Sequence, residues 1–360
     1  MKKNFIIYAP AINIQTGGAH SILENFLISI DPKLVSESNW SFIGNSEYEA
    51  ICASSNIHFH ALNLNKKWFL RIVYDYLIFK GKFLKNSPPS IIISMQNTTP
   101  FTRDCDSTLT YIHQAIPFIK TFKPHPIKNL KLFLIKHFYF FFIKLGITRE
   151  KSWFIVQSKW LKEMCAERLG IPEQKFFIHR PMPTDIDLQK FINKQTLKNT
   201  FFYPSLFQNY KNHLLLIEAF ILLAQAHDGE KFVLELTIDD QMIELPLNLE
   251  VKYYGMIPRS EALQKINNAT AVIYPSSIES YGIPIAEAIF LKTPVLASDL
   301  PYARELIGEE GIYFDSQNPE SIKKSVERFL QNGQSEIKAS SERFQDWTKV
   351  LENFLNKINK

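Results

Sequence analysis

The sequence has few cysteines and lacks the short motifs that mark several large enzyme classes. Its three cysteines, Cys52, Cys105 and Cys165, are odd in number and form no CxxC pair. This pattern excludes a disulfide scaffold and a thiolate zinc site, and it favours a reducing compartment. No GxGxxG, GxxxxGK or HExxH motif occurs, which argues against dinucleotide-dependent dehydrogenases, P-loop enzymes and zinc peptidases. Internal repeats and low-complexity tracts are absent as well.

Long apolar runs are also missing near the first residue. The run at 5–12 spans eight residues, is broken by Pro10 and is followed by polar residues and glycines. We therefore expect a first buried strand rather than a secretion signal. The 360 residues are 46% hydrophobic and 21% charged, which is typical of a folded protein, and the length predicts two domains.

The net charge of +5 is unevenly distributed. Residues 1–185 contain 23 Lys and Arg against 13 Asp and Glu, whereas residues 186–360 contain 18 against 23. Because the two halves carry charge of opposite sign, we expect two domains with different partners.

Short apolar segments alternate with helical patterns along the chain. The apolar residues run continuously through these segments, which indicates strands buried on both faces, as in a parallel sheet between helices. A polar, proline-containing stretch interrupts the alternation at 181–200. We therefore predict an α/β protein with two Rossmann-like, doubly wound domains, residues 1–182 and 201–334, joined by a hinge at 183–200. Ligands are expected at the carboxyl ends of the strands.

The predicted elements are placed as follows. In the first half, strands are expected at 4–9, 90–95, 108–112 and 153–157, and helices at 18–30, 66–84, 126–147 and 159–169. In the second half, strands are expected at 201–204, 231–238, 249–255, 271–275, 294–298 and 311–314, and helices at 211–227, 259–269, 283–292, 319–332 and 335–359.

The most polar constellation follows the strand predicted at 271–275. Glu279 precedes a helix that begins near Ile283, and Glu287 lies one turn inside that helix. The backbone N–H groups of Tyr281–Ile283 form an anion-binding helix end, and each carboxylate suits the recognition of sugar hydroxyls. The alternative is that these acids only complement the helix dipole and face solvent.

The segment from Glu279 to Glu287, with seven residues between the two acids, resembles the EX7E signature of retaining glycosyltransferases with the GT-B fold, and above all the bacterial family 4. Further segments stand in the order of that family, so that the resemblance spans about residues 4–315. These segments are Gly17-Gly18-Ala19-His20, Tyr111-Ile112-His113-Gln114, Gln157-Ser158-Lys159-Trp160, Tyr210-Lys211-Asn212-His213 and Tyr254-Gly255-Met256-Ile257-Pro258.

The resemblance implies a donor site in the second domain. Glu287 would bind the ribose hydroxyls, Glu279 would hold the donor sugar, and Lys211 would face the diphosphate. The backbone around Met256 and Ile257 would frame the nucleobase. The remaining implied contacts to the donor come from Gly17, Gly18, Ser280, Tyr281, Gly282 and Ile283.

The resemblance further implies a catalytic role for His113 near the anomeric carbon, and it implies that the last helix, within 335–360, packs onto the first domain. One departure concerns the diphosphate: the family places an arginine a few residues before the lysine, but residues 204–208 contain none. Lys211 would then carry more of the charge on the leaving phosphate.

Glycosyl transfer of this kind needs no metal and no cofactor. Negative charge grows on the leaving phosphate as the glycosidic bond breaks, and a fixed cation with helix N-termini can stabilise it. Two DxD triplets, Asp104 with Asp106 and Asp185 with Asp187, offer the pattern of a metal site. We interpret them as solvated loop carboxylates, because neither directly follows a predicted strand. On spacing alone, an ordinary histidine at a strand end is the favoured interpretation of His113, and only the resemblance supports a functional role.

A basic, aromatic stretch stands out in the first half. Residues 107–149 contain seven Lys and Arg and no acidic residue. Because lysines interrupt it, this stretch cannot span a bilayer, but an amphipathic helix within 118–144 suits the headgroups of an anionic membrane. An ordinary helix that buries its phenylalanines is the alternative, and no nucleic-acid-binding motif accompanies the charge.

These observations predict a glycosyltransferase that is retaining and metal-independent. It would move a hexosyl-type sugar from a UDP- or GDP-linked donor to a glycan or lipid-linked acceptor in bacterial lipopolysaccharide O-antigen or capsule synthesis. The expected location is the cytoplasmic face of the plasma membrane, as a peripheral protein. The alternatives are a catalytically inactive glycan- or membrane-binding scaffold, a phosphorylase, or a nucleotide-sugar epimerase of the same fold.

Overall fold

The computed structural model divides the chain into two compact units. The first comprises Met1–Pro181 with Phe344–Lys360, and the second comprises Met182–Arg343. The residues that the structure describes are 5–12, 14, 18–64, 68–84, 90–100, 105–181, 191, 195–333 and 347–358.

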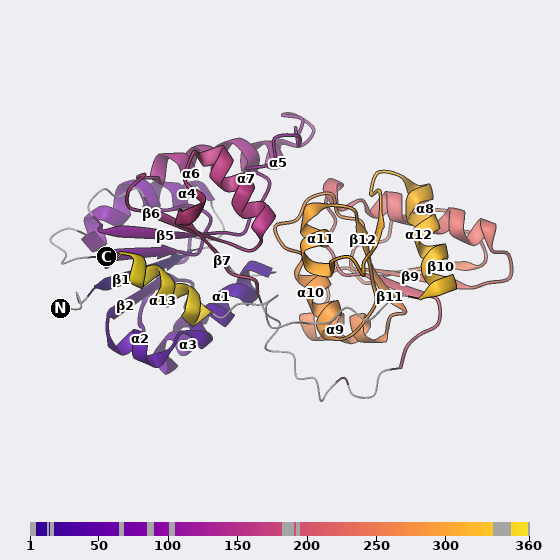
Figure 1. The fold of residues 1–360 in the computed structure, drawn as a ribbon, viewed down its shortest axis with the longest axis horizontal. Coiled ribbons are helices and arrows are strands. Elements are labelled where there is room, and N and C mark those ends of the chain that lie inside the picture. Colours follow the sequence, from indigo (N-terminus) through magenta and orange to yellow (C-terminus); the bar gives the residue numbers. More distant parts are fainter. Residues whose placement is uncertain are drawn as a thin grey trace. The chain divides into compact units, whose positions relative to one another are not determined.

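The first unit is a parallel sheet of seven strands in the order β3-β2-β1-β4-β5-β6-β7. Figure 1 shows α1, α3 and α13 on one side of this sheet and α4, α6 and α7 on the other. Because helices cover both faces, its central strands are buried throughout, as the continuous apolar runs predict. The strands are β1 (Ile6–Ala11), β2 (Asn39–Gly44), β3 (His58–Ala61), β4 (Ser90–Ser94), β5 (Ser107–Ile112), β6 (Ser152–Val156) and β7 (Phe176–Ile178).

The helices of the first unit include several that continue into one another. Helix α4 runs on through two π-helical turns, Tyr74–Ile78 and Lys80–Leu84, and a third π-helical turn, Ile135–Tyr139, joins α5 to α6. The helices are α1 (Gly18–Ser29), α2 (Pro32–Ser36), α3 (Glu49–Ser54), α4 (Trp68–Val73), α5 (Leu130–Leu134), α6 (Phe140–Gly146), α7 (Lys159–Leu169) and α13 (Trp347–Ile358).

The second unit is a parallel sheet of six strands in the order β10-β9-β8-β11-β12-β13. Its strands are β8 (Thr200–Tyr203), β9 (Phe232–Leu236), β10 (Leu249–Tyr253), β11 (Ala271–Tyr274), β12 (Val295–Ser298) and β13 (Ile312–Phe314). Its helices are α8 (His213–Ala226), α9 (Arg259–Asn268), α10 (Ile283–Phe290), α11 (Pro301–Ile307) and α12 (Pro319–Asn332).

Both sheets share the doubly wound order that the sequence predicts. In each, the strand order reverses beside the first strand, between β1 and β4 in one sheet and between β8 and β11 in the other. Loops that leave the carboxyl ends at such a reversal diverge and open a crevice, which is where open α/β sheets bind ligands.

Several elements differ from the sequence-based prediction. Strands β2, β3 and β7 and helix α11 are not predicted, because β2 and β3 carry polar residues and the other two are short. The helix predicted at 126–147 begins only at Leu130, and of the helix predicted at 335–359 the structure describes only α13, beginning at Trp347.

Helix α13 packs within the first unit although it ends the chain. Trp347 is buried and stacks on His179, with ring centroids 3.7 Å apart, and it also meets the edge of Phe26 at 4.9 Å. The Thr348 hydroxyl donates to the carbonyl of Ser29 at 3.0 Å. The last helix therefore contributes apolar surface to the N-terminal core.

Candidate functional site

Two residues that the resemblance places at the donor site meet at the strand-order reversal of the second unit. Lys211 lies in the loop after β8, Glu279 lies in the loop after β11, and the Lys211 ammonium pairs with Oε1 of Glu279. The Tyr274 hydroxyl donates to the same oxygen at 2.8 Å. The sheet therefore joins a cation and a carboxylate that are 68 positions apart in the sequence.

Aromatic rings enclose this Lys211–Glu279 pair. The Lys211 ammonium lies 5.6 Å from the ring centroid of Tyr210 and 5.8 Å from that of Tyr274, within the range of cation–π attraction. Burial, together with the charge of Glu279, raises the pKa of Tyr210 to about 12 and holds the pKa values of Tyr203 and Tyr274 well above their usual range. These tyrosines stay neutral, so that Lys211 and Glu279 are the charges of this cluster.

Hydrogen bonds from buried side chains shape the two loops. Asn212 has a φ of +55° and donates from Nδ2 to the Pro275 carbonyl at 2.9 Å and to the Ser277 hydroxyl at 2.7 Å. The Tyr302 hydroxyl donates to the Ser276 carbonyl at 2.7 Å. The loop after β8 is thus bound to the loop after β11, which holds Lys211 beside Glu279.

The start of α10 follows the predicted pattern. Gly282 adopts a φ of +97° immediately before Ile283, the first helical residue, and Pro284 occupies the first turn. An added Cβ at Gly282 would also lie 3.3 Å from Ile285. Glycine is therefore favoured at this position by its backbone as well as by space. Tyr281 is buried, and Ser280 is partly exposed.

Glu287 pairs with an arginine that the sequence analysis does not single out. Glu287 is 5% exposed, and its Oε1 accepts from Nε of Arg259 at 2.8 Å. Arg259 opens α9, just after the predicted nucleobase segment, in which Met256 is exposed and Ile257 is partly exposed. The pair therefore connects the EX7E segment to the loop after β10.

In the first unit, His113 lies just beyond the carboxyl end of β5. Its Nε2 is 2.9 Å from Nδ2 of Asn97, a residue that follows β4 and has a φ of +64°. Burial, and then the charge of Arg71, lowers the pKa of His113 to about 4. Gly18 begins α1, while Gly17 lies outside the described residues.

A buried polar cluster adjoins His113. The Gln96 side chain donates from Nε2 to both carboxylate oxygens of Asp75, at 3.0 and 2.8 Å, and accepts from the backbone N–H of Ile12 at 3.1 Å. Arg71 lies 3.7 Å from the Asp75 carboxylate. Burial raises the pKa of Asp75 to about 7 against the opposing pull of Arg71. The cluster joins the carboxyl ends of β1 and β4 to α4.

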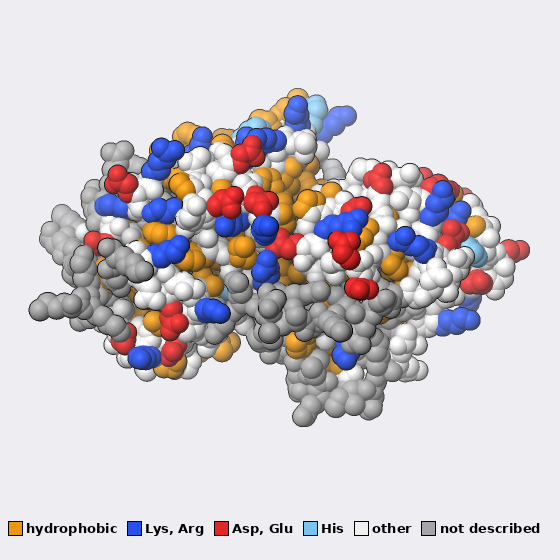
Figure 2. All heavy atoms as spheres, viewed as in Figure 1, with side chains coloured by type: hydrophobic (Ala, Val, Ile, Leu, Met, Phe, Trp, Pro, Cys, Tyr) orange, Lys and Arg blue, Asp and Glu red, His pale blue; other side chains and the backbone are white. Residues whose placement is uncertain are grey.

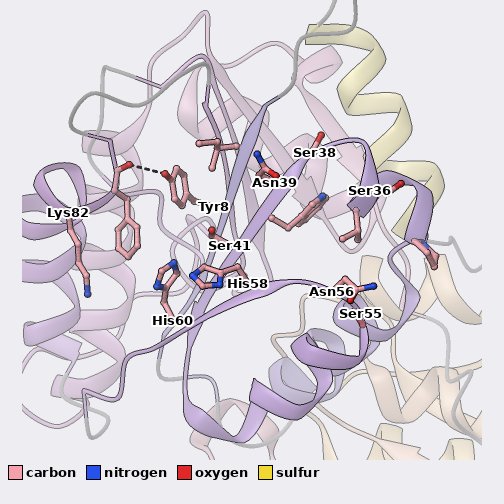
Figure 3. Close-up of a pocket in the computed structure, with 15 residues that line it drawn as sticks. Tyr8, Ser36, Ser38, Asn39, Ser41, Ser55, Asn56, His58, His60 and Lys82 are labelled. Carbon is pink, nitrogen blue, oxygen red and sulfur yellow. Dashed lines mark hydrogen bonds between the residues drawn. The ribbon is translucent and has the colours of Figure 1, made fainter.

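A cavity of about 730 Å³ lies at the other end of the first sheet, over the amino-terminal parts of β1, β2 and β3. Figure 3 shows His58, His60, Ser41 and Lys82 near one another on its wall. No acidic side chain is among its lining residues. It contains none of the predicted site residues.

Metal ligands do not cluster in the part of the chain that the structure describes: no group of three or more His, Cys, Asp and Glu side chains is arranged to hold an ion. Asp106 accepts from the backbone N–H of Ser90 at 2.6 Å, which is a structural role. Asp104, Asp185 and Asp187 lie outside the described residues.

The basic stretch at 118–144 is helical only from Leu130 onward, where α5, a π-helical turn and α6 follow one another. Phe118 is fully buried, and residues 118–129 precede α5. Lys136 is only 7% exposed and donates to the carbonyls of Ile119 and Phe122. Burial thus lowers the pKa of Lys136, and this lysine points into the fold instead of toward solvent.

Other side chains of that stretch are exposed. Phe138, Phe141 and Leu145 recur at helical spacing, and Figure 2 shows hydrophobic, basic and histidine side chains at the α5 end of the unit. The exposed large apolar residues are Ile127, Leu130, Phe138, Phe141 and Leu145, here called the α5–α6 patch. Within the described residues, we find no helix whose length and apolar character would let it cross a membrane.

Comparison with known proteins shows the class of this protein. Residues 184–346 match the family model "Glycosyl transferases group 1". The chain is 22% identical over 267 residues to the O-antigen chain mannosyltransferase RfbU of Salmonella typhimurium, covering 72% of this chain and 70% of that one. It is 26% identical over 203 residues to the uncharacterized glycosyltransferase MJ1607 of Methanocaldococcus jannaschii, covering about half of each, 51% and 52%.

Solved structures share the fold across nearly the whole chain. Anabaena Alr3699/HepE, in complex with UDP and glucose, has a TM-score of 0.62 at 13% identity, with 98% of this chain and 100% of that one covered. The lipopolysaccharide outer core galactosyltransferase WaaB has a TM-score of 0.62 at 15% identity, covering 98% and 99%. The fold is GT-B, as predicted. The protein is a glycosyltransferase, and its second unit matches the group 1 family.

Proposed function

We propose that this protein is a retaining, metal-independent glycosyltransferase of family 4. It transfers a hexosyl-type sugar from a UDP- or GDP-linked donor to a glycan or lipid-linked acceptor during assembly of a bacterial surface polysaccharide. The observation that carries the proposal is the Lys211–Glu279 pair at the strand-order reversal of the second sheet. The names of relatives such as the O-antigen chain mannosyltransferase RfbU support the substrate class.

The donor diphosphate is assigned to Lys211. As the bond between the anomeric carbon and the diphosphate breaks, negative charge grows on the leaving oxygen. A lysine ammonium held by Glu279 between two aromatic rings is already positioned to stabilise this charge. The N-terminus of α10 adds partial positive charge through the helix dipole. Charge stabilisation therefore comes from the protein itself.

The sugar and the nucleoside are assigned to the two glutamates. Glu279 already accepts from Tyr274 and Lys211, and a carboxylate has further acceptor sites for a sugar hydroxyl. Glu287, oriented by Arg259, would accept from the ribose hydroxyls, with the backbone of Met256 and Ile257 beside the base. An ionised carboxylate suits a diol because it accepts two hydrogen bonds.

The transfer step needs no side-chain nucleophile. The acceptor oxygen bonds to the anomeric carbon on the face that the diphosphate leaves, and the acceptor proton passes to the leaving phosphate oxygen. The configuration is thereby retained. His113 would act beside this centre from the acceptor side.

We propose that the enzyme binds its acceptor at a membrane surface. The α5–α6 patch exposes apolar side chains beside exposed lysines such as Lys128, Lys131 and Lys144, a combination that suits an anionic leaflet. We propose that the enzyme acts on the cytoplasmic face of the bacterial plasma membrane, where a lipid-linked acceptor would be reached.

Substitution of Lys211 tests the proposed function. For Lys211→Ala, we expect at least about a tenfold loss of turnover with a nucleotide sugar, because a fixed transition-state cation is removed. Lys324→Ala on the exposed side of α12 is the matched control and should keep full turnover. The donor is first identified by thermal shift with a panel of UDP- and GDP-linked sugars.

Equal turnover of Lys211→Ala and the control would remove Lys211 from the diphosphate site. Loss of turnover on treatment with a chelator would contradict metal independence. Failure of the whole panel, and of UDP and GDP, to bind would favour an inactive scaffold.

A further inference from the structure

The side chain of Asn97 is oriented by two backbone hydrogen bonds. Its Oδ1 accepts from the backbone N–H of His113 at 2.8 Å and from that of Gln114 at 3.0 Å. Both partners can only donate, so the atom that accepts them is the amide oxygen and the other is the amide nitrogen. Asn97 is 6% exposed, so that water does not compete freely for these bonds.

This orientation decides which nitrogen of His113 carries the proton. The amide Nδ2 of Asn97 lies 2.9 Å from Nε2 of His113, and an amide nitrogen can only donate. Nε2 must therefore accept, which leaves the proton of the neutral imidazole on Nδ1. In a protonated imidazolium, the Nε2–H group of His113 would face the amide N–H of Asn97, so that two donors would oppose each other.

The surrounding charges favour the same state. Arg71 of α4 is the charged group that acts on His113, and it disfavours a second positive charge. Tyr111 of β5 contributes a ring 5.9 Å away from the imidazole. Arg71 itself is held by Asp75 at 3.7 Å and approaches the Tyr139 hydroxyl at 3.5 Å.

From this geometry we propose that Asn97 is a positioning residue, which holds His113 neutral with its proton on Nδ1. His113 then offers one hydrogen-bond donor and no base. In the reaction proposed above, on which this role depends, the imidazole donates from Nδ1 to an oxygen of the bound sugar or acceptor. The acceptor proton goes to the leaving phosphate and not to His113.

Asparagine is well suited to this position. Its φ of +64° lies in the left-handed region, which asparagine tolerates better than most residues. No other uncharged side chain of this length has both an acceptor for the two N–H groups and a donor for Nε2. The isosteric aspartate would keep the acceptor but replace the donor by a second acceptor.

The test reads the tautomer directly by ¹⁵N NMR of the full chain labelled in histidine, with the His113→Gln spectrum identifying the signals. We expect wild-type His113 to give the pattern of a neutral imidazole protonated on Nδ1, unchanged from pH 8 to 5. In Asn97→Asp, the carboxylate would accept from Nε2–H, so the signals should titrate at a higher pH.

Activity provides the second reading. Asn97→Gly keeps the left-handed backbone and removes the side-chain amide. Asn97→Asp replaces the amide donor that faces Nε2 of His113 with an acceptor. Each should lower kcat about tenfold, which corresponds to one hydrogen bond of about 1.4 kcal/mol, and Asn97→Asp should add an ionisation to the pH profile of kcat. Asn56→Gly is the matched control, since Asn56 is exposed and also has a positive φ, +54°.

Each result has one meaning. A wild-type His113 that is protonated on Nε2 or titrates between pH 6 and 7 would overturn the proposal, whether or not the protein transfers sugar. The expected tautomer together with normal kcat in Asn97→Gly would overturn the positioning role. Absence of transfer in the wild type, with the expected tautomer, would contradict the proposed function instead.

Discussion

At the scale of single residues, two arginine–carboxylate pairs differ in their surroundings. The Arg259–Glu287 pair includes a nearly buried carboxylate, whereas the Arg304–Asp299 pair is exposed on both sides, at 43% and 51%. Water screens the exposed pair, while the buried carboxylate depends on its partner. The two pairs should therefore respond differently to loss of the arginine.

For Arg259→Ala, we expect the free energy of unfolding to fall by about 1–3 kcal/mol, because the Glu287 carboxylate loses a charged donor. For Arg304→Ala, the matched control, the loss should be smaller, because water already screens this exposed pair. Denaturant unfolding of the second unit measures both. Equal losses in the two variants would contradict the structural role assigned to Arg259.

Sequence motifs of short span supply candidate site residues, but they do not reveal partners that are distant in the sequence. The sequence shows Glu279, Glu287 and Lys211 as candidates, but Lys211 and Glu279 are brought together only by neighbouring strands. Arg259 and Asn97 carry no local signal. Each becomes notable only through contacts with residues 28 and 16 positions away.

At the scale of elements, helix α13 shows how a terminal segment contributes to a core. Its buried side chains, Trp347, Val350, Leu351 and Phe354, recur on one face. Trp347 contacts Phe26, Tyr111 and His179, which belong to three different parts of the unit. Removing this ring leaves a cavity that these partners cannot all fill.

We therefore expect Trp347→Ala to lower the free energy of unfolding of the first unit by about 3–5 kcal/mol. Lys349→Ala, on the exposed side of the same helix, should change it by less than about 0.5 kcal/mol. Denaturant unfolding followed by tryptophan fluorescence and circular dichroism compares them. A loss below about 1 kcal/mol for Trp347→Ala would show that α13 is not part of the cooperative core.

Whether a helix or strand can be predicted depends on its length and on the periodicity of its hydrophobic residues. Helices α7 and α12 have the ends that the sequence predicts, because capping residues and the hydrophobic pattern mark where each helix begins and ends. Strand β3, with the sequence HFHA, is too polar to be recognised as a buried strand. The π-helical turns beside α4 and α5 leave no obvious trace in the sequence, since they arise from packing.

At the scale of the whole molecule, the net charge differs between the two halves of the chain: residues 1–185 carry an excess of Lys and Arg, and residues 186–360 carry an excess of Asp and Glu. The α5–α6 patch lies in the stretch 107–149, whose charged residues are all basic, although Lys120 of that stretch pairs with Glu167 of α7. Exposed apolar residues grouped with one sign of charge are typical of a surface that binds a partner of opposite charge.

Vesicle flotation tests the proposed partner. The full protein should float with vesicles of anionic phosphatidylglycerol, but less with neutral phosphatidylcholine or at high salt. The double variant Phe141→Ser with Leu145→Ser should weaken binding about tenfold, because apolar area enters the interface. The control Ile28→Ser with Leu247→Ser changes two apolar residues elsewhere that are more exposed than Phe141 and Leu145. Equal binding of the two double variants would contradict attachment through the patch.

The sequence by itself determined the class of fold and supplied candidate residues for the site. Short continuous apolar segments that alternate with helical patterns are typical of a parallel sheet covered on both faces, and two acids at EX7E spacing bracket one helix start. These are local properties, because each depends on residues within a few turns of one another.

The tertiary structure alone decided which groups act together. Lys211 meets Glu279, Arg259 meets Glu287 and Asn97 meets His113 across neighbouring strands or loops. It also turned Lys136 inward, although its sequence neighbours suggest a solvated face. Hydrogen bonds and burial depend on distance in space, and a sequence pattern records only distance along the chain.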